Sequence, residues 1–79
     1  MYKIYGLSDC NYCKNATVLL QARGLSYAYF ALDNNEQVLS EIKQENNWPT
    51  VPMIFFTADD GNEHFVGGYD NLVESLRGK

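Results

Sequence analysis

Several features are scarce in this chain of 79 residues, and each scarcity argues against a class of protein. It has only two cysteines, Cys10 and Cys13, too few for a disulfide-stabilised secreted scaffold. No apolar run approaches the roughly 18 residues of a membrane span, and the first residues lack the pattern of a signal peptide. Six Lys and Arg against ten Asp and Glu give a net charge of −4. We therefore expect neither nucleic acid nor a membrane as a partner.

The composition is that of a folded globular chain. Hydrophobic residues make up 46% and charged residues 20%, and the length predicts a single domain over residues 1–79. A disulfide between Cys10 and Cys13 would close a loop so short that it adds only about 2 kcal/mol. The pair is therefore expected to be reactive rather than structural, which favours a reducing, cytoplasmic location.

The hydrophobic pattern predicts seven elements in the order β-α-β-α-β-β-α. Strands are expected over residues 2–5, 27–32, 51–57 and 64–66. Helices are expected from about Cys10 to Gly24, from the caps at 33–35 to before Pro49, and from Asp70 or Asn71 onward. A helical crossover makes the first two strands parallel, and the last two form a hairpin. The fold class is therefore α/β, with a four-stranded mixed sheet and helices on both faces.

Individual residues extend this prediction. Ser8 or Asp9 is expected to cap the first helix, and Asp70 or Asn71 the last. His64 is expected on the solvent face of an edge strand. Four aromatic residues are expected in the core: Phe30, Phe55, Phe56 and Phe65.

The segment Cys10-Asn11-Tyr12-Cys13 is a C-x-x-C motif after a strand, at the start of a helix and inside a βαβ unit. This context is typical of redox-active dithiols. Unpaired N–H groups and the positive end of the helix dipole favour a thiolate, which is the nucleophile in thiol–disulfide exchange. Cys10 is expected to be more exposed and to attack the substrate, and Cys13 to be shielded and to resolve the mixed disulfide.

Two other interpretations of the cysteines stay open. C-x-x-C also begins many zinc motifs, but structural zinc needs four ligands and only His64 is a further strong candidate, so no metal site is predicted. The thiols could also be inert.

Three more segments, taken with the C-x-x-C motif, indicate a protein family. They are Thr50-Val51-Pro52 before the third strand, Gly67-Gly68-Tyr69-Asp70 before the last helix, and the Tyr12-Cys13 end of the motif. With these segments, the chain resembles the glutaredoxins of the thioredoxin fold over nearly its whole length. It is most similar to short dithiol members of the phage and bacterial type.

The resemblance implies a glutathione site. Pro52 would be a cis proline facing the cysteines, and Val51 would bond the backbone of the cysteine in glutathione. Gly68 and Tyr69 would let the chain approach closely, while Asp70 and Asn71 would hold the γ-glutamyl end. The substrate-binding residues implied in this way are Tyr12, Thr50, Val51, Pro52, Gly68, Tyr69, Asp70 and Asn71.

The sequence also departs from the family pattern. Asn11 stands in place of the proline of Cys-Pro-Tyr-Cys, which leaves the reduction potential open. Leu7 stands near the place of a lysine that pairs with a glutathione carboxylate in many members, so affinity is reduced or another cation such as Lys14 serves. Trp48-Pro49 is similar to the monothiol, cluster-carrying members, although Cys13 argues against that group.

Three functional hypotheses follow. The leading one is an enzyme, a monomeric glutathione-dependent oxidoreductase without a tightly bound cofactor. It would reduce protein disulfides and glutathione mixed disulfides, with ribonucleotide reductase as a possible partner. The second is a redoxin recharged by thioredoxin reductase. The third is a protein that holds a [2Fe–2S] cluster between two chains through Cys10 and glutathione.

Overall fold

The computed structural model describes residues 1–77. Its elements run in the predicted order: β1 (Tyr2–Gly6), α1 (Asn11–Ala22), β2 (Tyr27–Ala31), α2 (Glu36–Glu45), β3 (Met53–Thr57), β4 (Glu63–Gly67) and α3 (Tyr69–Arg77). Among the strands, the boundaries differ most at β3, which begins two residues later than predicted, and at β4, which is one residue longer at each end.

The four strands form one mixed sheet in the order β2-β1-β3-β4. β1 and β2 are parallel, with Tyr2 opposite Tyr27, and β3 is antiparallel to both β1 and β4. The predicted crossover and hairpin are therefore confirmed. β1 and β3 occupy the centre, which explains why the apolar run at the start of β3 is buried.

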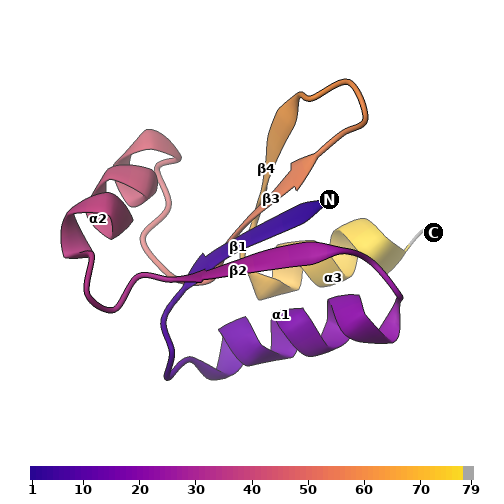
Figure 1. Ribbon diagram of the computed structural model, residues 1–79, viewed down its shortest axis with the longest axis horizontal. Coiled ribbons are helices and arrows are strands. Elements are labelled where there is room, and N and C mark those ends of the chain that lie inside the picture. The colour runs from indigo at the N-terminus through magenta and orange to yellow at the C-terminus, as the bar shows by residue number, and fades with distance from the viewer. Residues whose placement is uncertain (78–79) are drawn as a thin grey trace.

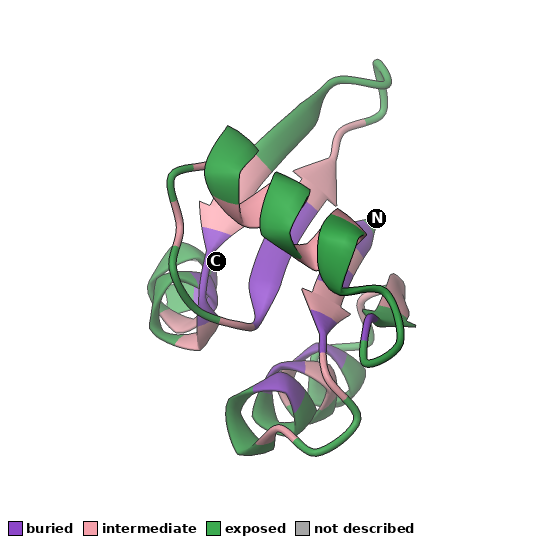
Figure 2. Cartoon of the chain, turned by 90° about the vertical axis from the view of Figure 1, so that its left-hand side faces the viewer, coloured by how far each residue is buried: buried purple, intermediate pink, exposed green. Residues whose placement is uncertain are grey.

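The helices lie on both sides of this sheet, which confirms the predicted fold class. Figures 1 and 2 show α1 and α3 together on one side and α2 on the other, near the end where β1 leads into α1. α2 contributes no fully buried residue. The main core lies between the sheet, α1 and α3, and its buried members are Tyr2, Ile4, Ala16, Leu20, Ile54, Leu72 and Leu76.

The other face of the sheet carries a row of aromatic rings. Tyr5 stacks on Phe30 and meets Phe55 edge-on, and Phe55 contacts Phe65. The prediction that Phe30 belongs to the core is wrong, because its side chain is 40% exposed. Tyr27 and Tyr29 pack against the core, so the alternation of side chains turns Phe30 to the other face of an edge strand.

The N-cap of α2 is Asn35, within the predicted range 33–35, but the predicted cap of the first helix is wrong. The N-cap of α1 is Cys10, not Ser8 or Asp9, and its sulfur accepts a hydrogen bond from the Cys13 N–H. The Ser8 N–H instead binds Asp33. The loop before α1 is thus tied to the end of β2, and the first cysteine takes the cap position.

The last helix begins at Tyr69, one residue before the predicted caps. The Asn71 side chain accepts a hydrogen bond from the Gly68 N–H at 3.0 Å, and the Leu72 N–H donates to the Gly68 carbonyl. Asn71 therefore reaches back from inside the first turn, as the third residue of a capping box does. Asp70 lies in the first turn, where its negative charge interacts favourably with the positive end of the helix dipole.

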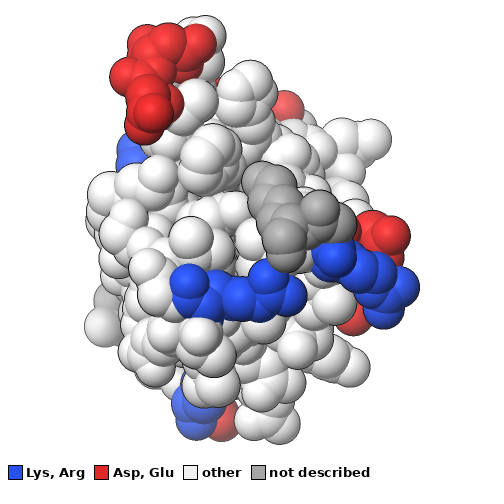
Figure 3. All heavy atoms as spheres, turned by 90° about the vertical axis from the view of Figure 1, so that its right-hand side faces the viewer, with Lys and Arg blue, Asp and Glu red and all other residues white. Residues whose placement is uncertain are grey.

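Charge is unevenly distributed over the surface. Figure 3 shows acidic side chains gathered over the β3–β4 turn, where Asp59 and Asp60 are exposed. Figure 1 places this turn at the opposite end of the molecule from the start of α1. Within residues 1–77, no helix is long and apolar enough to cross a membrane.

Candidate active site

Cys10 and Cys13 form a disulfide at the start of α1, with their Cα atoms 5.2 Å apart. Cys10 is half-buried and has extended backbone angles, whereas Cys13, one turn inside the helix, is fully buried. This confirms the predicted difference in exposure. In the reduced protein, the hydrogen bond from the Cys13 N–H to the Cys10 sulfur would favour the Cys10 thiolate.

The loop between α2 and β3 supplies one wall of the site. The peptide bond between Val51 and Pro52 is cis, as expected, and Pro52 is buried. Thr50 is exposed and Val51 half-buried, so the loop presents both residues at the surface.

The turn between β4 and α3 supplies the facing wall. Gly67 has a φ of 121°, and a Cβ on it would lie 2.7 Å from the Asn71 side chain, so only glycine fits there. A Cβ on Gly68 would meet no protein atom nearer than Trp48 at 3.5 Å, and the close approach of Gly68 to glutathione stays a prediction. The glycine that the turn requires is therefore Gly67, which held no predicted binding role.

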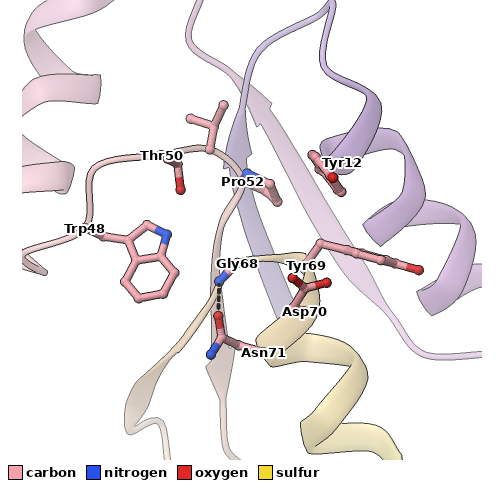
Figure 4. A pocket seen from close by; sticks show the side chains of 9 residues that line it. Tyr12, Trp48, Thr50, Pro52, Gly68, Tyr69, Asp70 and Asn71 are labelled. Carbon is pink, nitrogen blue, oxygen red and sulfur yellow. Dashed lines mark hydrogen bonds between the residues drawn. The ribbon is translucent and has the colours of Figure 1, made fainter.

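These segments enclose a pocket of about 340 Å³ beside the start of α1. In Figure 4, Trp48 and Thr50 lie on one side of it, Tyr12, Tyr69 and Asp70 on the other, and Pro52 and Gly68 between them. The lining consists of Trp48 and all of the predicted substrate-binding residues: Tyr12, Thr50, Val51, Pro52, Gly68, Tyr69, Asp70 and Asn71. That they bind glutathione remains a prediction.

Two tyrosines stand beside the pocket. Tyr12, between the cysteines, is 61% exposed, and its ring centre lies 6.1 Å from that of Tyr69 on α3. They offer an apolar surface with polar tips next to the disulfide, which suits a peptide-like ligand.

Trp48 was not predicted as a site residue; the sequence only marked it as similar to the monothiol members. It is the single tryptophan of the chain, and its ring meets Phe65 edge-on at 5.4 Å. Its buried indole N–H has no hydrogen-bond partner among residues 1–77. Its position two residues before Thr50 is a signal that could have included it in the site.

Leu7 lines a second pocket of about 360 Å³, together with other apolar and acidic residues: Asp9, Leu32, Asp33, Glu36 and Leu39. No lysine or arginine is among these lining residues, and Lys14 lines neither pocket. A ligand carboxylate entering this pocket would therefore meet negative charge rather than a cation.

No group of three or more His, Cys, Asp or Glu within residues 1–77 could hold a metal ion. A cluster shared between two chains would draw one cysteine from each, so this finding does not bear on that hypothesis.

The family model described as Glutaredoxin matches residues 2–60. The chain belongs to the glutaredoxin family. It is 34% identical over 70 residues to glutaredoxin 3 of Escherichia coli K12, covering 89% of this chain and 78% of that protein. It is 29% identical to an uncharacterized monothiol glutaredoxin of Porphyra purpurea, covering 82% of this chain and 56% of that protein. The chain thus spans just over half of this second relative.

Solved structures agree with this glutaredoxin assignment. A dithiolic glutaredoxin from Trypanosoma brucei brucei is 34% identical, with a TM-score of 0.75 over 98% of this chain and 76% of that one. A buckwheat glutaredoxin–glutathione complex has a TM-score of 0.84 at 24% identity, covering 98% and 68%, and shows the shared fold. With a cysteine pair at the start of α1, this glutaredoxin is a thiol oxidoreductase of the thioredoxin fold.

Proposed function

We propose that this glutaredoxin is a glutathione-dependent enzyme that reduces protein disulfides and glutathione mixed disulfides through Cys10 and Cys13. One observation carries the proposal: the pocket beside the disulfide is lined by every residue that the family resemblance implied for glutathione. These residues come from α1, the loop before β3 and the start of α3, so the sequence places them far apart.

The chemistry follows from the positions of the two sulfurs. The Cys10 thiolate attacks a substrate disulfide, forms a mixed disulfide and releases one substrate thiol. The buried Cys13 then attacks Cys10, releases the second thiol and leaves the Cys10–Cys13 disulfide. Two molecules of glutathione return the protein to the dithiol and leave as glutathione disulfide, so electrons balance over the cycle.

Glutathione would lie across the pocket. Asp70, exposed at its edge, suits the γ-glutamyl ammonium group, and the N–H groups of the first turn of α3 suit the neighbouring carboxylate. The Val51 backbone would pair with the cysteine of glutathione, whose sulfur would then point toward Cys10.

The proposal includes a cytoplasmic location, where glutathione is kept reduced. It also includes action as a monomer, because the disulfide end of the molecule must be free to meet protein substrates. Ribonucleotide reductase is one such substrate to test.

The direct test is reduction of a small glutathione mixed disulfide by glutathione, with glutathione reductase and NADPH reporting turnover. We expect a rate well above the uncatalysed exchange. A folded, fully reduced protein that gives only the uncatalysed rate would contradict the proposal.

Asp70→Asn should raise the KM for the glutathione mixed disulfide by about five- to tenfold, because one charge-assisted hydrogen bond is lost. The fluorescence of Trp48, the single tryptophan, provides a second readout of binding because Trp48 lines the same pocket. Glu74→Gln is the matched control, since it removes one exposed charge from the same helix outside the pocket. Equal KM values for the two variants would refute the role of Asp70.

A second candidate is a redoxin recharged by thioredoxin reductase. The acidic lining of the pocket beside Leu7 favours it, because a carboxylate of glutathione would find no cation there. Comparing recharging by glutathione with recharging by thioredoxin reductase separates the two candidates. Faster recharging by the reductase at physiological glutathione concentration would replace the first proposal with this one.

A further inference from the structure

Gly6, the last residue of β1, lies close to two side chains that are distant in sequence, those of Cys13 and Tyr29. A Cβ on Gly6 would lie 2.6 Å from the Cys13 sulfur and 2.7 Å from the Tyr29 hydroxyl oxygen. The sulfur and the hydroxyl oxygen both lie beside Gly6, within about 5 Å of each other.

Tyr29 holds its hydroxyl in place in the oxidised protein. Its O–H donates to the Leu7 carbonyl at 2.6 Å, and its ring packs against the main core from β2. Burial, and secondly the Asp33 carboxylate, raises the pKa of Tyr29 above its usual value, so the phenol stays protonated at neutral pH. It is thus a neutral hydrogen-bond donor beside the sulfur.

Few other polar groups near Cys13 could stabilise its thiolate. Cys13 is fully buried, and no polar or charged residue among residues 1–77 is buried. Charged and titratable side chains on the neighbouring segments are Asp9, Tyr12 and Lys14 at the start of α1, Asp33 after β2, and Tyr69 and Asp70 at the start of α3. The four charged ones are exposed, so solvent screens their effect on the sulfur.

We propose that Tyr29 is the positioning residue for the resolving cysteine, donating its hydroxyl hydrogen bond to the Cys13 sulfur when the disulfide is reduced. The inference rests on the proposed exchange chemistry. In the disulfide form the hydroxyl donates to the Leu7 carbonyl. Once reduction frees the Cys13 sulfur from the S–S bond, turning of the Cys13 side chain and of the phenol O–H brings the two groups into contact. The bond stabilises the thiolate, which a buried site otherwise disfavours.

The step that Tyr29 assists is the resolution of the mixed disulfide. Cys13 loses its proton, and its thiolate attacks the Cys10 sulfur. The bond from Cys10 to the substrate sulfur breaks as the Cys10–Cys13 bond forms. The substrate leaves as a thiolate and takes up a proton from solvent, which balances the proton lost by Cys13, and Tyr29 keeps its own.

Tyr29→Phe tests this, because it keeps the ring and removes only the hydroxyl. Reduced protein is mixed with bis-hydroxyethyl disulfide, quenched with acid and analysed by mass spectrometry, which separates formation of the Cys10 mixed disulfide from its resolution. We expect formation at the unchanged rate and resolution about tenfold slower at neutral pH, the effect of one lost charge-assisted bond. The difference in resolution rate between Tyr29→Phe and the unchanged protein should disappear at high pH, where Cys13 ionises without the Tyr29 hydrogen bond.

Tyr27→Phe is the matched control. Tyr27 lies on the same strand, but its hydroxyl accepts from Gln21 at the surface, so both rates should equal those of the unchanged protein. Equal resolution rates for Tyr29→Phe and the unchanged protein, or a slowing that persists at high pH, would overturn the inference.

A second measurement needs no variant. In the reduced, unchanged protein, the NMR ring signals of Tyr29 should follow the same pH curve as the Cβ signal of Cys13. Independent curves would overturn the inference even if Tyr29→Phe failed to fold.

The outcome of the mass-spectrometry experiment also bears on the proposed function. Bis-hydroxyethyl disulfide has no γ-glutamyl group, so that experiment tests the role of Tyr29 even if the protein does not depend on glutathione. If no Cys10 mixed disulfide forms at all, the proposed function is refuted as well.

Discussion

Cys10→Ser should reduce turnover with every substrate to the uncatalysed rate, because no other sulfur can attack the substrate. Cys10 is the half-buried cysteine at the surface, and Cys13 is fully buried behind it. Cys13→Ser should keep the monothiol reaction with glutathione mixed disulfides, which needs only the first attack. It should lose reduction of protein disulfides, which needs resolution by the second sulfur.

The two cysteine variants serve as controls for one another. Each removes the same disulfide, and so each loses the same small stabilisation of about 2 kcal/mol. A difference in activity between them therefore reflects the roles of the sulfurs rather than folding. Full activity of Cys10→Ser, or equal loss in both variants with a glutathione mixed disulfide, would contradict the assigned roles.

Gly6→Ala should lower the free energy of unfolding by about 1–3 kcal/mol, the cost of overpacking a well-packed site. The added methyl group would lie 2.6 Å from the Cys13 sulfur and 2.7 Å from the Tyr29 hydroxyl, so at least one of them must move. Denaturant unfolding followed by circular dichroism measures the change.

Gly68→Ala is the matched control for this substitution. Its added methyl group would meet only ordinary contacts, the nearest at 3.5 Å, and Gly68 has no positive φ. Its free energy of unfolding should stay close to that of the unchanged protein. If Gly6→Ala were as stable as Gly68→Ala, the close approach of β1 to the Cys13 sulfur would not hold in solution.

Much of the fold was predictable because its signals are local. The element order, the parallel β1–β2 pair and the β3–β4 hairpin follow from apolar periodicity and turn residues. The exposure of Cys10 relative to Cys13 follows from their spacing on a helix. The prediction failed where local signals were ambiguous, as at the caps of the first and last helices. Several neighbouring polar residues suit a cap equally well by type.

Phe30 shows a different kind of failure. An aromatic residue in a strand suggests burial, but β2 is an edge strand and Phe30 turns away from the main core. The alternation of side chains along a strand decides which face of the sheet a residue occupies. How far that face is covered depends on where α2 packs. That placement is a property of the assembled chain.

The sequence by itself determined the C-x-x-C dithiol, its place at the start of a helix and the order of the elements. Through the family resemblance it also indicated eight residues that line the pocket. Only the tertiary structure decided that Trp48 joins those residues in one pocket, and that the Tyr29 hydroxyl and the Cys13 sulfur both lie beside Gly6. The physical reason is the range of the interactions. Helix starts, turns and alternation depend on neighbours in the chain, while a pocket or a close approach depends on the packing of segments that the chain itself keeps apart.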